Sequence, residues 1–377
     1  MPHLRPWLLF ALILIACGTS SSPPEDNPPE VPDAGVPDAG TPADAGTDPF
    51  ARVDALVTAV VADAGVPGLS LAVYDAQDRR VFVKNYGDFA PDRRVAIASA
   101  SKMVSGIALL RLVDAGVLSL DTTTGEVLGW TDLKGTITLR HLLSFTSGLP
   151  TSNPCTAQSG ITLAQCVEQI ATSTLVAAPG TRFDYGSPHL QVAARMAEVR
   201  TGKPWKTLFE EQVKTPLGLG DAELAYYTFP RNTLGTSNPL IAGGLRATMD
   251  EYAKILGVVF HRGTVGGVRY ASAPLFDEQS REPYDVVVGS SPMKDVGQPY
   301  RYGLTAWLEC DTPSTGCAAV SSPGAFGFTP WVDRDSGYYA ILGMELESTQ
   351  EQRVAAFAIR LEQQLRPEIG AAVARTR

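Results

Sequence analysis

Ser99 and Lys102 stand three positions apart at the start of an apolar stretch, IASASKMVSGIALLRLVDAG (97–116). Residues at this spacing share one face of a helix. A buried ammonium is costly unless it is paired or used, and both burial and the positive end of a helix lower the pKa of a lysine. A neutral amine can accept the proton of a serine hydroxyl. The pair therefore predicts a nucleophilic Ser99 activated by Lys102.

The spacing alone is not specific, because Ser291 and Lys294 repeat it. Pro292 and the polar run KDVGQPY (294–300) follow that second serine, so we expect a solvated loop that buries no lysine. For the first pair, a serine N-cap beside a snorkelling lysine stays an alternative.

Other catalytic machineries have little support in the sequence. It contains no Gly-x-Ser-x-Gly elbow, no His-Glu-x-x-His pair and no phosphate-binding glycine loop. A serine triad would need His141, His189 or His261, and we expect structural roles for the first two. The net charge of −9 and the lack of a basic run argue against a nucleic-acid partner.

The first 48 residues predict export and anchoring. Arg5 precedes an apolar run over 7–16, which is short for a membrane span, and Leu-Ile-Ala-Cys (14–17) resembles the lipobox of bacterial lipoproteins. We expect a signal peptide over 1–17 and a lipidated Cys17, with a plain secretory signal as the alternative. Because Gly18 follows the cysteine, the usual sorting rule implies an outer-membrane lipoprotein. Residues 18–48, with VPDAGVPDAGTPADAG, predict a disordered tether.

The remaining residues, 49–377, predict one α/β domain. A helix is expected over 52–65, strands over 69–75 and 79–87, and further strands near the C-terminus before a last helix over 351–365. The middle, roughly 120–265, reads as helices and loops. Strands at both ends of a chain with helices between them indicate a mainly antiparallel sheet built from both termini, with an inserted helical subdomain.

Besides Cys17, the chain has four cysteines, and an even number in an exported chain indicates disulfides. Short loops favour the pairs Cys155–Cys166 and Cys310–Cys317. Zinc is the alternative, but the chain has no Cys-x-x-Cys pair and only four histidines.

Several stretches in order resemble the serine β-lactamase and penicillin-binding protein superfamily, in its class C and esterase-like branch. They are GVPGLSLAVYD (65–75), IASASK (97–102), ITLRHLLSFTSGLP (137–150), PGTRFDYGSPHLQVAARMAEVRTGKPW (179–205) and IAGGLRATMDEYAKIL (241–256). The last of these also offers Thr248 and Glu251 as a capping box. The resemblance implies the β-lactamase/transpeptidase-like fold.

The resemblance also implies roles for particular residues. Ser99 would be the acylated nucleophile, Lys102 its base or hydrogen-bond partner, and Tyr185 a proton relay to the leaving group. Ser322 and Gly324 align with the strand motif that contacts substrate. The N–H groups of Ala325 and Ser99 would form the oxyanion hole. No metal or organic cofactor is implied.

The chain departs from the family pattern at some of these positions. Ser187 stands where the family usually has an asparagine, and Ser322 and Pro323 replace a cationic or hydroxyl-bearing pair. Without that charge, recognition of a β-lactam or D-Ala carboxylate is weakened, so a small neutral ester, or an amide or peptide, fits better. Phe145 replaces a common histidine.

The sequence therefore predicts a lipid-anchored serine hydrolase, most simply an esterase. A β-lactamase or D-Ala-D-Ala carboxypeptidase on the same machinery is the first alternative. A non-catalytic cell-envelope binding module is the second.

Overall fold

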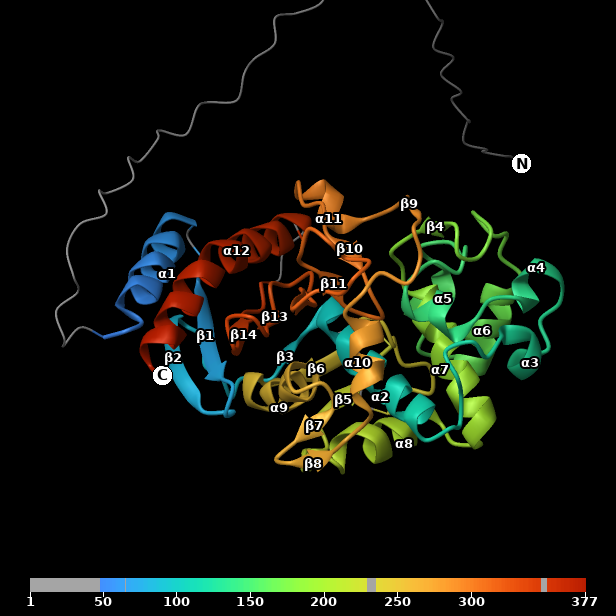
Figure 1. Ribbon diagram of the computed structural model, residues 1–377. Coiled ribbons are helices and arrows are strands. Elements are labelled where there is room, and N and C mark those ends of the chain that lie inside the picture. The colour runs from blue at the N-terminus through green and yellow to red at the C-terminus, as the bar shows by residue number, and fades with distance from the viewer. Residues whose placement is uncertain (1–47, 65, 229–234, 347–350) are drawn as a thin grey trace, which may run out of the picture. The chain divides into compact units, whose positions relative to one another are not determined.

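The computed structural model describes residues 48–64, 66–228, 235–346 and 351–377, with only the backbone at 351 and 352 (Figure 1). Cys17, the expected signal peptide and nearly all of the expected tether lie outside these residues. Within them, no helix combines the length and apolarity needed to cross a membrane.

One antiparallel sheet organises the described residues. Its seven strands follow the spatial order β10-β11-β12-β13-β14-β1-β2. Their bounds are β10 (Arg301–Tyr302), β11 (Trp307–Leu308), β12 (Ala319–Ser321), β13 (Thr329–Asp333), β14 (Tyr338–Gly343), β1 (Gly68–Asp75) and β2 (Arg80–Gly87). Strand β1 pairs with β14 from Ser70↔Gly343 to Asp75↔Tyr338, so strands from the two ends of the chain are neighbours inside the sheet. The predicted mainly antiparallel sheet built from both termini is confirmed.

Both faces of the sheet are covered by helices. Alternate residues of β1 point to opposite faces: Leu69, Leu71 and Val73 join one apolar cluster, and Ala72 and Tyr74 join the other. Helices α1 (Ala51–Ala64) and α12 (Glu351–Arg375) cover the first face, and α9 (Met249–Phe260) covers the second (Figure 1). Every residue of β1 is buried, as expected for a strand between two layers.

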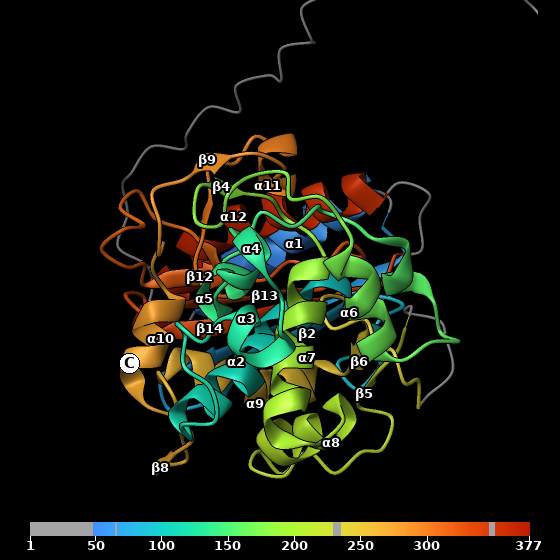
Figure 2. The same ribbon diagram turned by 90° about the vertical axis from the view of Figure 1, so that its right-hand side faces the viewer.

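Helix α2 (Ser101–Asp114) connects the sheet layer to the helical region. Its first ten residues are all buried, because it packs against α7 and, through the larger apolar cluster, against the sheet. The helical region comprises α3 (Thr124–Leu128), α4 (Asp132–Gly135), α5 (Leu139–Leu143), α6 (Leu163–Ala171), α7 (Pro188–Thr201), α8 (Trp205–Phe209) and the turns η2 (Pro154–Ala157) and η3 (Glu210–Lys214). Figure 2 looks onto these helices.

Short elements complete the fold. Three small sheets pair β3 (Val95–Ala96) with β6 (Leu245–Ala247) and β5 (Ala225–Tyr226), β4 (Arg182–Phe183) with β9 (Val287–Val288), and β7 (Thr264–Val265) with β8 (Val268–Arg269). Two further helices are α10 (Ala273–Gln279) and α11 (Pro292–Asp295). Helix α11 replaces the loop expected at the second Ser-x-x-Lys, although Lys294 is exposed there, as expected.

Other local predictions can be compared directly. Thr248 caps α9 and forms a capping box with Glu251. Disulfides join Cys155 to Cys166 and Cys310 to Cys317, the pairing that short loops favoured. Helix α12 runs ten residues beyond its expected end and contains Pro367.

Candidate active site

Ser99 lies in a short 3-10 turn, η1 (Ala98–Ala100), just before α2. Ala98 has a φ of 44°, a left-handed conformation that is uncommon and strained for alanine. Hydrogen bonds from other elements hold the turn: Ser322 Oγ donates to the Ser99 carbonyl at 3.2 Å, and Tyr252 Oη donates to the Ala100 carbonyl at 2.9 Å. The sheet and α9 therefore fix the backbone on which the Ser99 hydroxyl is carried.

Lys102 is the buried neighbour that the sequence predicted. Its side chain is 4% exposed, and Nζ lies 2.9 Å from Ser99 Oγ and donates to the Ala242 carbonyl at 2.8 Å. Burial lowers its pKa to about 7. Within the described residues, no acidic side chain forms an ion pair with it. A large share of the lysine is therefore neutral near pH 7, with a lone pair that can accept the Ser99 proton.

Tyr185 is the third side chain of the candidate site, beside Ser99 and Lys102. The centroid of its ring lies 4.5 Å from Lys102 Nζ. Burial raises the pKa of the phenol above its ordinary value, and hydrogen bonds with Ser99 and Trp307 oppose that rise. The phenol stays protonated at neutral pH, so the amine of Lys102 is the better base, and Tyr185 is placed to pass a proton onward.

Tyr185 is held by backbone pairing and by aromatic packing. Its N–H donates to the Ser290 carbonyl at 2.9 Å, and its ring stacks on Trp307 with centroids 5.1 Å apart. Phe145, which replaces the common histidine, is fully buried and meets Tyr185 edge to face at 5.1 Å. An aromatic side chain at 145 thus supports the position of the phenol.

The third predicted motif lies beside η1. A Cβ on Gly324 would stand 2.3 Å from the Ile97 carbonyl oxygen, so only glycine allows this approach. Ala325 faces the cleft, and within the described residues neither its N–H nor that of Ser99 donates to a backbone carbonyl. Both are therefore available for an oxyanion. Ser322 is 3% exposed and bonds to the Ser99 carbonyl, so its placement supports positioning of the nucleophile rather than contact with substrate.

Other candidates lie away from the cleft. Ser187 is the N-cap residue of α7, its side chain makes no cap hydrogen bond, and it does not line the cleft around Ser99. His189 is fully buried, contacts Ser147 Oγ at 2.8 Å, and has its pKa lowered to about 3 by burial. Among the described residues, no cluster of three or more His, Cys, Asp or Glu side chains could hold a metal ion.

A cleft of about 600 Å³ opens above Ser99. Its walls include residues that the sequence analysis did not assign to the site: Ser290, Pro292, Met293, Asp295 and Val296 around α11, Trp307 on β11, and Arg353, Ala355, Ala356, Ile359 and Arg360 on α12. The sequence analysis considered the segment around α11 only as a second Ser-x-x-Lys, and it expected a solvated loop there rather than a wall of the site.

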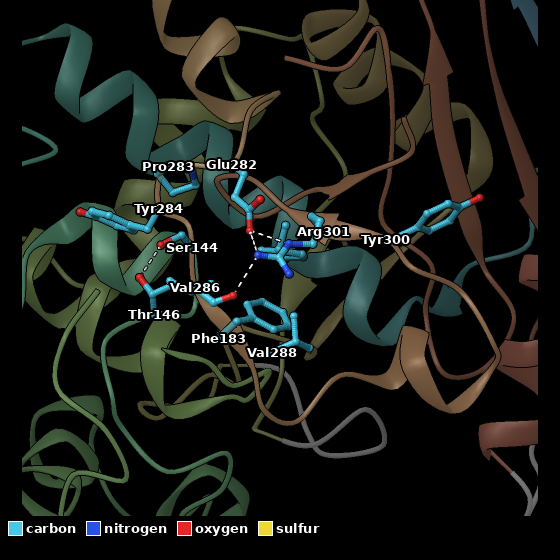
Figure 3. A pocket seen from close by; sticks show the side chains of 11 residues that line it. Ser144, Thr146, Phe183, Glu282, Pro283, Tyr284, Val286, Val288, Tyr300 and Arg301 are labelled. Atoms are coloured by element: carbon cyan, nitrogen blue, oxygen red, sulfur yellow. Dashed lines mark hydrogen bonds and ion pairs between the residues drawn. The ribbon is translucent and has the colours of Figure 1, made fainter. Parts of the chain in front are cut away.

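A second hollow is too small to bind substrate (Figure 3). It measures about 10 Å³, room for one water at most. Arg301 crosses it and bonds to Glu282 Oε1 and to the Val286 carbonyl, at 2.7 and 3.0 Å. Phe183 and Tyr302 line it and also contact Tyr185. The residues around this hollow therefore help to hold the Tyr185 ring in position.

Comparisons with known proteins agree with this geometry. The model of the Beta-lactamase family matches residues 53–364. A Bacteroides dorei DSM 17855 structure, provisionally assigned as a β-lactamase, is 31% identical, with a TM-score of 0.69 over 79% of this chain and 91% of that one.

Two curated relatives match in part. The D-alanyl-D-alanine-carboxypeptidase/endopeptidase AmpH of Escherichia coli (strain K12) is 31% identical over 45% of this chain and 48% of its own. The monacolin J acid methylbutanoyltransferase of Aspergillus terreus (strain NIH 2624 / FGSC A1156) is 25% identical over 48% and 52%. The chain spans about half the length of these curated relatives. The family model covers most of the chain, and the chain therefore belongs to the β-lactamase family, within the superfamily of serine β-lactamases and penicillin-binding proteins.

Proposed function

We propose that the chain is a serine hydrolase that forms an acyl-enzyme on Ser99, with carboxylic esters as its preferred substrates. The observation that carries the proposal is the contact of Lys102 Nζ with Ser99 Oγ at 2.9 Å, made by an amine whose pKa burial lowers to about 7. Ser99 also lines an open cleft, so a substrate carbonyl bound there can reach its hydroxyl.

The proposed reaction has two steps. Ser99 Oγ attacks the carbonyl carbon while its proton passes to Lys102 Nζ, and the carbonyl oxygen gains negative charge facing the N–H groups of Ser99 and Ala325. The proton then moves, by way of Tyr185, to the departing alkoxide as the carbon–oxygen bond breaks. Water attacks the acyl-serine, returns a proton to the site and releases the acid.

The preference for esters rests on the third motif. Pro323 has neither a hydroxyl nor an N–H, and Ser322 is committed to the Ser99 carbonyl. The D-Ala-D-Ala peptidase activity named for the AmpH relative makes a carboxypeptidase the second candidate. Labelling by a fluorescent penicillin supports that candidate, whereas labelling by ester-type probes alone supports the esterase.

A burst experiment tests the proposal. p-Nitrophenyl acetate should give a burst of p-nitrophenol, and the intact protein should gain an acetyl group on Ser99. Ser99→Ala should abolish both. The absence of a burst between pH 6 and 10, with no acyl adduct from esters, amides or β-lactams, would contradict the proposal and favour a non-catalytic cell-envelope module.

We also propose that the protein is an exported lipoprotein anchored through Cys17. The Leu-Ile-Ala-Cys stretch supports this, as do the two disulfides, which are typical of oxidising compartments. Cys17→Ala should move the protein from the detergent phase to the aqueous phase. Retention of the variant in the detergent phase would count against the anchor.

A further inference from the structure

A separate hollow is lined by residues of α8, η3 and β5, and we call it the α8 pocket. Its volume is about 290 Å³, near the lower end for small-molecule sites. None of the residues that line it also lines the cleft over Ser99. Its walls are largely apolar and include the buried side chains of Trp205, Phe209, Leu224, Tyr226 and Pro239.

Lys214 brings a nearly buried cation to this apolar pocket. Its side chain is 7% exposed and pairs with Glu210 Oε2 at 2.9 Å, whereas the Glu210 side chain is 52% exposed. A solvated carboxylate is a weak partner, because water screens its charge. Lys214 ends η3, a π-helical turn in which the Thr215 N–H donates to the Glu210 carbonyl at 2.9 Å. Such turns occur frequently at functional sites.

The charged side chains that line the α8 pocket leave one positive charge in excess. They are Lys206, Glu210 and Lys214. Lys206 is exposed, and no hydrogen bond or ion pair of its side chain is recorded within the described residues. Asp221 also interacts electrostatically with Lys214, but it does not line the pocket and it pairs with Arg94 at 2.6 Å. A ligand with a single negative charge would balance the excess.

Trp205 adds an unused hydrogen-bond donor to the wall. Its side chain is 1% exposed, and its Nε1 has no hydrogen-bond partner within the part of the chain that the structure describes. Buried donors without a partner are rare, and an absent bound group is one explanation for them. Aromatic walls, a cation and a spare donor together match a ligand with an apolar body and one anionic, hydrogen-bond-accepting head.

We propose that the α8 pocket binds a small apolar monocarboxylate. The hydrocarbon part lies against the aromatic side chains of Trp205, Phe209 and Tyr226, and the carboxylate is held at Lys214. An ammonium and a carboxylate form a charge-assisted hydrogen bond, which is stronger than one between neutral groups. This inference goes beyond the hydrolase activity proposed at Ser99 and does not depend on it.

Calorimetric titration of the full-length protein with 4-phenylbutanoate tests the proposal, with 4-phenylbutanamide as the neutral ligand of the same shape. We expect saturable binding of the acid and at least tenfold weaker binding of the amide. Lys214→Gln should weaken binding of the acid roughly tenfold to hundredfold, the range for a charge-assisted contact. It should leave binding of the amide nearly unchanged.

Two further variants locate the site. Ala222 is exposed and lines the α8 pocket, so Ala222→Trp should fold and obstruct binding of the acid. The matched control is Lys203→Gln, because Lys203 forms a similar ion pair, with Glu211 at 2.7 Å, but does not line the pocket. It should bind the acid as the wild type does, and thermal unfolding reports whether each variant is folded.

The outcomes separate this inference from the proposed function. Absence of saturable binding of the acid, or equal affinity for acid and amide, would refute the carboxylate site. Binding of the acid that neither Lys214→Gln nor Ala222→Trp weakens would place the ligand elsewhere, in the Ser99 cleft for example, and would refute the site as well. None of these measurements involves acylation, so the burst experiment on Ser99 stands or fails separately.

Discussion

Gly324→Ala tests how closely the third motif must approach the nucleophile turn. The new Cβ would lie 2.3 Å from the Ile97 carbonyl oxygen and 3.2 Å from the Phe328 carbonyl oxygen. Ordinary contacts begin near 3.4 Å, so one backbone segment must move by about 1 Å. Both segments carry a proposed oxyanion donor, Ser99 on one and Ala325 on the other. A 1 Å misplacement at an active site costs on the order of 100-fold in rate.

The assay is the rate of acetylation by p-nitrophenyl acetate, measured beside thermal unfolding. We expect a loss of about 100-fold in acylation rate and about 1–3 kcal/mol in stability from the clash. Gly160→Ala is the control, because no atom lies within 4 Å of its added Cβ and its φ is not left-handed. Wild-type acylation by a folded Gly324→Ala protein would refute the reasoning.

Three further predictions concern other parts of the molecule. The kcat/KM for neutral esters should rise with pH and level off above about pH 7, where Lys102 loses its proton; an inflection near 10.5 would contradict this. Burial, with further contributions from Glu309 and Asp333, raises the pKa of Glu362 well above its usual range, whereas Arg366 opposes the rise. A carboxyl whose pKa is raised in the folded state contributes stability that is lost as pH rises. The melting temperature of Glu362→Gln should therefore rise relative to that of the wild type between pH 5 and pH 8. A difference in melting temperature that stays constant over this range would contradict the prediction. Replacing Cys155 and Cys166 by serine should lower the free energy of unfolding in urea by about 2–3 kcal/mol, and an unchanged midpoint would show that this bridge is dispensable.

Much of the fold could be predicted from local sequence patterns. Three features depend only on residues near one another in sequence. They are the apolar runs of β1 and β14, the apolar stretch of α2 and the capping box at Thr248. Such features can be read from spacing. The pairing of β1 with β14 was expected only in outline, because strand order depends on contacts between residues far apart in the chain.

In the site, too, features that depend on local spacing could be predicted, whereas those that depend on distant contacts could not. The contact of Ser99 with Lys102 follows from helical spacing and was predicted directly. Tyr185 and Gly324 came from the family resemblance, and the structure brings both next to the turn that carries Ser99. Ser322 also came from the resemblance and lies next to this turn, where its hydroxyl donates to the Ser99 carbonyl. The α12 wall could not be predicted, since nothing local to Arg360 shows that its helix crosses the cleft.

The protonation state of Lys102 is the claim on which the account depends. Its titration can be followed by two-dimensional NMR on protein labelled with ¹³Cε-lysine, with the signal assigned from its loss in Lys102→Arg. The account predicts a midpoint near pH 7, more than three units below the usual 10.5. A Lys102 signal that titrates near 10.5 with the other lysines would contradict it, because the amine would then be charged and unable to take the proton of Ser99.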